Sequence, residues 1–349
     1  MGRKVKMGVL GTGKIGRLHL DSLINYIPDA EVVHVVDPYI SEETVAWLHE
    51  HGVTAIDTDS ERLFSNPEAE AVLILTPTDT HAELIVKAAR AGKHIFCEKP
   101  VDFDLDKIIA AMREVKEAGV KFQIGFNRRF DHNFKRMREI VVSGKIGDPH
   151  ITKISSRDPA PPPMEYVKSS GGIFMDQMIH DFDMIRYLTG KEVVSVFSQG
   201  SVQIDDEIGR LGDVDTAVVT LQFSDGTVGV IDNSRQAVYG YDQRAEVFGS
   251  KGCCMADNDT DTRVSVVTTE GTVSDIPPYF FLQRYFQAYV DEMKSFVRDL
   301  QEDREPACGI ADAIRPVVIA KAATQSQKTG LPVKLADILD ESVIADVVK

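Results

Sequence analysis

The sequence is poor in cysteine and tryptophan and has no long apolar run. Its apolar stretches, such as residues 71–75, fall far short of the ~18 residues that suggest a membrane span. Four cysteines without a C-x-x-C pair are too few for a disulfide scaffold in 349 residues, and they give little support for a zinc site. We therefore expect reduced thiols, no bound metal and no transmembrane segment.

Basic residues are also in deficit. There are 39 Lys and Arg against 54 Asp and Glu, a formal charge of -15. Nucleic acids and anionic membranes are bound by basic surfaces, so neither is an expected partner. The basic N-terminus runs directly into a glycine-rich turn and lacks the apolar core of a signal peptide, which favours a cytoplasmic location.

The composition is that of a globular protein, with 43% apolar and 27% charged residues. At ~150 residues per domain, the length suggests about two domains. Residues 1–125 alternate short apolar runs with helical patterns, which predicts a doubly wound parallel sheet. Ser41 is expected to cap one helix, Thr80 and Glu83 to start another, and Asp104 to start a third. The predicted strands are Val5–Leu10, Val32–Val36, Ala71–Leu75, His94–Cys97 and Lys121–Ile124.

Residues 126–349 begin with helices and continue with longer alternating strands, which predicts a second domain with an antiparallel sheet. Asp225-Gly226 is a hairpin signal. Two closing helices are expected over residues 279–303 and 311–328, and packing of C-terminal helices on the first domain is left open. The expected strands are Val193–Ile204, Thr216–Phe223, Thr227–Asn233, Ala245–Phe248 and Val264–Thr268.

A glycine motif follows the first predicted strand. In G-T-G-K-I-G, Gly11 permits a tight turn, Gly13 lets the backbone approach a pyrophosphate, and Gly16 lets the helix pack on the strand. The bare pattern is common in flexible turns. Here Asp37 ends the second strand 21 residues after Gly16, where a carboxylate binds a ribose 2′-hydroxyl. The context predicts dinucleotide binding.

Asp37 also predicts NAD in preference to NADP, because a carboxylate would repel a 2′-phosphate. Lys14, inside the glycine loop, could meet a pyrophosphate or a 2′-phosphate, which leaves some NADP use open. The alternative interpretation of Lys14 is a solvated surface lysine.

Two segments are candidates for the chemistry. Glu98-Lys99-Pro100 closes a strand of the nucleotide domain, where ligands of such folds collect, and its Lys-Pro bond is a candidate cis peptide. The alternative is a surface lysine at a strand end. Asp176 and His180 have i, i+4 spacing on an expected helix, which suits an imidazole base oriented by a carboxylate. The alternatives are a structural acid and histidine, or a metal site that includes Asp183.

Further polar residues in the second domain could recognise a polyol, because such recognition needs several converging donors and acceptors. Each could also be a surface residue. The candidates are Arg128, Arg129, Arg157, Asp158, Tyr239 and Tyr241.

Taken together, GTGKIG, CEKP, GFNRRF, GGIFMDQMIHDFDMIRYL and VYGYDQRAEVFGSKG resemble the glucose-fructose oxidoreductase and inositol dehydrogenase family over almost the whole chain. The resemblance implies an α/β fold: an N-terminal Rossmann domain and a C-terminal α/β domain with an open, mostly antiparallel sheet that serves substrate binding and oligomerisation. It also implies NAD as cofactor, a polyol substrate and a homotetramer. The implied cofactor-binding residues are Gly11, Gly13, Lys14, Ile15, Gly16, Asp37, Thr76, Glu98 and Lys99.

By the same resemblance, Lys99, Asp176 and His180 form the catalytic set. His180 would be the general base, Asp176 would orient it, and Lys99 would hold the reacting oxygen. The expected reaction is oxidation of a ring hydroxyl of an inositol, myo-inositol to 2-keto-myo-inositol. The implied substrate-binding residues are Lys99, Arg129, Arg157, Asp158, Asp176, His180 and Tyr239.

One departure bears on the substrate. Some inositol dehydrogenases have a histidine and an asparagine around Arg157, whereas this chain has Ser156 and Asp158. The alternatives therefore include scyllo-inositol, D-chiro-inositol and an aldose. A regulator that binds NAD and sugar without turnover, and a metal-dependent isomerase or lyase, are more remote possibilities.

Overall fold

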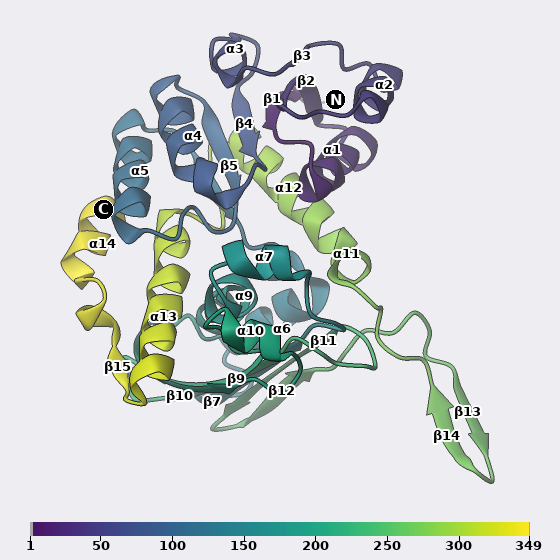
Figure 1. Ribbon diagram of the computed structural model, residues 1–349, viewed down its shortest axis with the longest axis vertical. Coiled ribbons are helices and arrows are strands. Elements are labelled where there is room, and N and C mark those ends of the chain that lie inside the picture. The colour runs from purple at the N-terminus through teal and green to yellow at the C-terminus, as the bar shows by residue number, and fades with distance from the viewer. Residues whose placement is uncertain (1–2, 349) are drawn as a thin grey trace. The chain divides into compact units, whose positions relative to one another are not determined.

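A computed structural model describes residues 3–348, which divide into two compact units (Figure 1). The first unit contains the chain up to Asn127, Ala288–Arg315 and the segment from Glu341. The second contains Arg128–Gln287 and Pro316–Asp340. No helix among residues 3–348 is long and apolar enough to cross a bilayer.

The first unit is built on a six-stranded parallel sheet, as the sequence predicts. Its strand order is β3-β2-β1-β4-β5-β6, with β1 at the centre beside β4. The order reverses there, as in doubly wound nucleotide-binding folds. The strands are β1 (Val5–Leu10), β2 (Ala30–Val36), β3 (Ile56–Asp57), β4 (Ala71–Ile74), β5 (His94–Glu98) and β6 (Phe122–Gly125).

Helices connect these strands. Ser41 caps α2 by accepting from the Thr44 N–H, and Asp104 caps α5, as predicted. The predicted capping box at Thr80 is wrong. α4 begins at Thr78, and the Thr80 hydroxyl donates to the Pro77 carbonyl at 2.7 Å. The helices are α1 (Lys14–Tyr26), α2 (Glu42–Glu50), α3 (Ser60–Phe64), α4 (Thr78–Arg90) and α5 (Leu105–Ala118).

C-terminal helices complete the first unit. In α12 (Phe286–Gln301), Met293, Phe296 and Val297 share a buried core with β1, β4 and β5. α14 (Glu341–Val348) packs on α5. α13 (Ile310–Thr329) begins in this unit and continues into the second from Pro316 onward. An amphipathic helix buries its apolar stripe on a sheet because burial releases water from apolar surface.

The second unit has a seven-stranded sheet of order β12-β11-β7-β10-β9-β8-β15. Neighbouring strands are antiparallel except for the parallel pair β7 and β10, so the sheet is mostly antiparallel, as expected. Its strands are β7 (Pro149–Arg157), β8 (Val193–Ser201), β9 (Thr216–Phe223), β10 (Val228–Ser234), β11 (Asp242–Gly249), β12 (Gly252–Ala256) and β15 (Val333–Lys334).

Two strand predictions need correction. β7, a central strand, was not predicted because its buried face alternates Thr152, Ile154 and Ser156, which gives no apolar signal. The strand expected at Val264–Thr268 lies outside the large sheet. It forms a separate hairpin of β13 (Ser265–Thr268) and β14 (Gly271–Ser274), which stands away from that sheet in Figure 1.

Helices α6 and α9 pack together, and α9 lies against β7. The helix expected to run through Asp176 and His180 is broken. α8 ends at Asp176, Gln177 and Met178 form a turn, and α9 begins at Ile179. The remaining helices are α6 (His132–Val142), α7 (Met164–Ser169), α8 (Ile173–Asp176), α9 (Ile179–Thr189), α10 (Asp206–Arg210) and α11 (Phe281–Arg284), with 3-10 turns η1 (Asn127–Phe130) and η2 (Leu335–Asp337).

One set of alternating positions on the large sheet stays exposed. In β9, for example, Ala217, Val219, Leu221 and Phe223 are buried while Val218 is 45% exposed. Exposed apolar side chains continue across the neighbouring strands at Ile151, Val194, Val228, Phe248 and Met255. We call these residues, with Val218, the open face. Apolar residues spread over a sheet face are typical of an interaction surface.

Candidate active site

The glycine loop joins β1 to α1 with the steric demands that its sequence predicts. Gly11 has φ +94°, and a Cβ there would lie 2.7 Å from the Leu75 carbonyl oxygen. A Cβ on Gly16 would lie 2.2 Å from the Gly11 oxygen, so the helix can approach the turn only without a side chain. A Cβ on Gly13 would meet nothing within 4 Å. The loop thus leaves open space at the start of α1, where backbone N–H groups favour an anion such as a pyrophosphate.

Asp37 lies beside this loop at the end of β2. Its Oδ2 accepts hydrogen bonds from the backbone N–H and the hydroxyl of Thr12, both at 2.7 Å, and its Oδ1 accepts from the Tyr39 N–H at 2.8 Å. These bonds fix the carboxylate in place, and each oxygen keeps lone pairs for further donors such as ribose hydroxyls. Lys14 is exposed at the first position of α1, with Ile15 beside it half-buried.

Thr76 follows β4, the next strand along the sheet. His81 of α4 is buried with its Nε2 2.7 Å from the Thr76 carbonyl oxygen and its Nδ1 2.8 Å from the Pro100 carbonyl oxygen. Burial lowers the pKa of His81. This histidine, which was not singled out in the sequence, joins the segments that follow β4 and β5.

Lys99 follows β5, and the Lys99–Pro100 peptide bond is cis. The Glu98 carboxylate is largely enclosed. Its Oε1 lies 2.8 Å from His19 Nε2, and its Oε2 accepts from the Lys99 N–H at 3.2 Å. The predicted cofactor residues thus follow four adjacent parallel strands, β2, β1, β4 and β5, so they meet at one edge of the sheet. Ligands of such sheets bind outside the carboxyl ends of the strands.

In the second unit, Asp176 is held by two residues that the sequence did not point to. The Tyr166 hydroxyl on α7 donates to Asp176 Oδ1 at 2.7 Å, and Arg235 Nη1, after β10, lies 3.2 Å from Oδ2. The Arg235 side chain is fully buried, and its Nη2 lies 3.7 Å from Asp213 Oδ2. A cation buried this deeply needs carboxylate partners.

Asp158 lies in the same charged neighbourhood. Burial, with a contribution from the Asp176 carboxylate, raises the pKa of Asp158 to about 7, against the opposing effects of Arg235 and Arg128. A carboxyl group whose pKa lies near neutrality can donate or accept a proton at working pH, and such groups concentrate at functional sites.

Arg128 and Tyr241 belong to a buried network. Arg128 Nη1 donates to Asp181 Oδ1 at 2.6 Å, and its Nη2 donates to the Tyr241 hydroxyl at 3.2 Å. Asn233 donates to the other Asp181 oxygen at 2.9 Å. Burial raises the pKa of Asp181 in this network.

Arg157 and Tyr239 are brought together as well. Arg157 Nη1 donates to the Tyr239 hydroxyl at 3.2 Å, and that hydroxyl donates to Asp242 Oδ2 at 2.6 Å. Arg157 also pairs with Asp232 across the β7–β10 pair. Tyr239 is 40% exposed, so its ring remains accessible.

Arg129 and Asp183 form a buried, two-point ion pair. Arg129 Nε and Nη2 donate to the two Asp183 oxygens at 2.7 and 2.5 Å, and the guanidinium lies over the Tyr187 ring. A carboxylate occupied in this way is a poor metal ligand. Among residues 3–348, the two groups of side chains close enough to share a metal ion contain neither Asp176, His180 nor Asp183.

His180 lies half-buried in the first turn of α9, four residues after Asp176 and across the helix break. Lys99 belongs to the first unit, and Asp176 and His180 to the second. Sequence reasoning missed Tyr166, Arg235, His81 and His19 because none belongs to a local motif. Tyr166 has only its place after the proline cluster at residues 159–163 as a signal.

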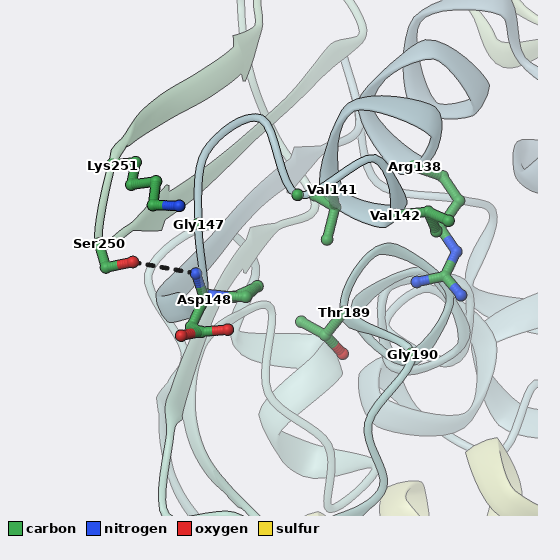
Figure 2. Close-up of a pocket in the computed structure, with 11 residues that line it drawn as sticks. Arg138, Val141, Val142, Gly147, Asp148, Thr189, Gly190, Ser250 and Lys251 are labelled. Atoms are coloured by element: carbon green, nitrogen blue, oxygen red, sulfur yellow. Dashed lines mark hydrogen bonds between the residues drawn. The ribbon is translucent and has the colours of Figure 1, made fainter.

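A pocket elsewhere in the second unit is distinct from these groups (Figure 2). It has a volume of about 510 Å³, and the Ser250 hydroxyl accepts the Asp148 N–H at 3.1 Å beside it. It contains none of the predicted site residues. Its lining is Arg138, Val141, Val142, Gly144, Gly147, Asp148, Pro149, Thr189, Gly190, Ser250 and Lys251.

Comparison with known proteins assigns both halves of the chain. Residues 5–126 match the profile described as "Oxidoreductase family, NAD-binding Rossmann fold", and residues 134–255 match the "GFO/IDH/MocA C-terminal domain". "Uncharacterized oxidoreductase YrbE" of Bacillus subtilis is 45% identical over 96% of this chain and 98% of its own. "Myo-inositol 2-dehydrogenase" of Thermotoga maritima is 45% identical over 96% of this chain and 100% of its own.

A solved structure extends the comparison to ligands. The scyllo-inositol dehydrogenase of Lactobacillus casei, with bound NAD(H) and scyllo-inositol, is 29% identical, with a TM-score of 0.89. The match covers 96% of this chain and 100% of that one.

Proposed function

The chain belongs to the GFO/IDH/MocA family of NAD-dependent oxidoreductases, and we propose that it oxidises a ring hydroxyl of an inositol, taking myo-inositol to 2-keto-myo-inositol. The observation that carries the proposal is the Asp176 carboxylate, held by Tyr166 and Arg235 just before His180. The near-full-length similarity to a myo-inositol 2-dehydrogenase supports the substrate class.

The nucleotide end fits NAD. The open space at Gly13 would admit the pyrophosphate, and Asp37, already fixed by Thr12, would accept from the ribose hydroxyls. Residues 1–125 would form the NAD-binding domain and residues 126–349 the substrate and assembly domain. NAD, when bound, accepts the hydride.

The chain's own residues would handle the proton and the oxygen. His180 takes the hydroxyl proton as general base, Asp176 orients the imidazole and stabilises its charged form, and the Lys99 ammonium stabilises the developing alkoxide. Tyr166 and Arg235 keep the Asp176 carboxylate ionised and fixed. The remaining ring hydroxyls would be recognised by Arg157, Asp158 and Tyr239, with Arg129 behind them.

We assign the open face to assembly into a homotetramer, because its exposed apolar side chains would be removed from water there. Such a cytoplasmic enzyme would act in inositol catabolism. Size-exclusion chromatography with light scattering tests the assembly. Met255→Glu, at an exposed position of the face, should give smaller species, whereas Val142→Glu, on α6 away from that face, should not.

The function is tested by initial rates of NADH formation with myo-inositol, scyllo-inositol, D-chiro-inositol and glucose, each repeated with NADP. We expect the highest kcat/KM with NAD and myo-inositol. A value for myo-inositol more than about tenfold below that for scyllo-inositol would move the assignment to the isomer that the Lactobacillus casei enzyme binds. NAD binding without turnover of any of the four would contradict the proposal.

A further inference from the structure

A buried histidine lies beneath the predicted catalytic lysine. His19, on α1, has no solvent exposure, and its Nε2 lies 2.8 Å from Glu98 Oε1. The rings of Phe96 and Tyr289 meet the imidazole edge-on, with centroids 5.3 and 5.5 Å away. An aromatic enclosure of this kind holds the imidazole in one orientation, so its hydrogen bond to Glu98 has a defined direction.

Glu98 passes this restraint to the backbone of Lys99. Glu98 Oε2 accepts the Lys99 N–H at 3.2 Å, so one carboxylate spans the His19 ring and the residue that leaves β5. A Cβ on Gly125 would lie 3.0 Å from Glu98 Oε2, which shows how closely β6 encloses the carboxylate. His19, Glu98, Lys99 and Gly125 all lie within the first unit, so the chain of contacts belongs to one rigid sheet and its helix.

The enclosure makes the restraint depend on the histidine. A carboxylate withdrawn from water needs donors for its oxygens, and here they are His19 Nε2 and the Lys99 N–H. If the imidazole donor were lost, Glu98 would turn toward another donor or toward water and would release the Lys99 N–H. The lysine would then leave the sheet with a less defined geometry.

We propose that His19 is a positioning residue that sets the place of Lys99 through Glu98. The proposal rests on the proposed function, because it gives Lys99 a role in turnover. A misplacement of about 1 Å in a catalytic group can lower the rate by about 10²-fold, so a residue outside the reacting shell can control kcat. His19 would therefore affect turnover without touching substrate.

The test compares two amides of similar size and polarity. In His19→Gln the side-chain amide nitrogen occupies the place of Nε2 and can still donate to Glu98. In His19→Asn the amide nitrogen reaches only the place of Nδ1. We expect His19→Gln to retain kcat within about threefold and to keep the wild-type pH profile, and His19→Asn to lose about 10-fold to 10²-fold in kcat. The Kd for NAD, measured by calorimetry, should stay the same in both.

Leu23→Ala is the matched control for loosened packing, because Leu23 lies one turn further along the buried side of α1 and does not contact Glu98. It should lower the Tm with little change in kcat. Equal kcat losses in His19→Gln and His19→Asn, or a loss in His19→Asn that lies entirely in NAD affinity, would overturn the proposal.

Two further measurements separate this proposal from its neighbours. Crystal structures of the two variants should keep the Glu98–Lys99 bond in His19→Gln and lose it in His19→Asn. The same bond in both would refute the positioning role even if the wild type oxidised no polyol. Glu292 brings a second carboxylate within 4.8 Å, so a stoichiometric metal found in the wild type by mass spectrometry and lost in His19→Asn would replace the positioning role with a metal site.

Discussion

Replacing Asp158 with asparagine should stabilise the folded protein, and the gain should depend on pH. Burial raises the pKa of this carboxyl to about 7 from 3.8, so the folded state holds a proton that the unfolded chain releases. Below about pH 4 both states are protonated and the group has no effect. From there to pH 7 the unfolded chain ionises first, so wild-type stability falls as the pH rises.

The size of the effect follows from that difference. About three pKa units at ~1.4 kcal/mol each amount to about 4 kcal/mol of lost stability above pH 7. Asparagine has nearly the same shape and does not ionise. Asp158→Asn should therefore gain little near pH 4 and up to about 4 kcal/mol above pH 7, while losing activity if Asp158 contacts substrate.

Urea unfolding at a fixed protein concentration, at pH 5 and pH 8, measures the gain. Asp225→Asn is the control of opposite sign. Hydrogen bonds from Lys191 and Thr227 lower the pKa of Asp225, so its contribution is present at neutral pH and is lost as the pH falls. That variant should be less stable than wild type at pH 8 and should approach it in acid. A gain for Asp158→Asn that is the same at pH 5 and pH 8 would refute the reasoning.

Three other predictions follow from the assigned roles. His180→Ala should lower kcat by a factor of about 10² to 10⁴ in steady-state assays and leave the Kd for NAD unchanged; wild-type kcat at every pH would exclude His180 as the base. Asp37→Ser should raise kcat/KM with NADP relative to NAD, and an unchanged ratio would show that Asp37 does not set the preference. Arg128→Met should cost about 3 to 5 kcal/mol in urea unfolding by stranding Asp181, and the added Asp181→Leu change should recover much of it; no recovery would contradict the pairing.

The nucleotide half could be predicted because its signals are local. Short apolar runs, helix caps at Ser41 and Asp104, and a glycine motif with an acid about 20 residues further on each lie within one strand-turn-helix segment. The comparisons confirm the predicted family, the Rossmann fold and the NAD cofactor. In the second half, the strands that alternate apolar and polar residues were found, and β7 was missed because its buried side chains include threonine and serine.

Spacing along the chain was a weaker guide wherever the backbone departed from regular structure. The i, i+4 argument for Asp176 and His180 assumed one helix, yet a turn at Gln177 and Met178 separates α8 from α9. Thr80 has the residues of a capping box but lies inside α4, because the chain already turns at Pro77. In both cases the backbone path decides which residues share a face.

The sequence by itself determined the fold class, the dinucleotide site and the residue types available for polyol chemistry, because each depends on local periodicity or on motifs with fixed spacing. Only the tertiary structure decided which partners hold those residues. Arg235 reaches Asp176 across 59 positions, and His19 reaches Glu98 across 79. Such pairs are selected by the burial of charge, which leaves a carboxylate stable only where folding delivers a donor from a distant part of the chain.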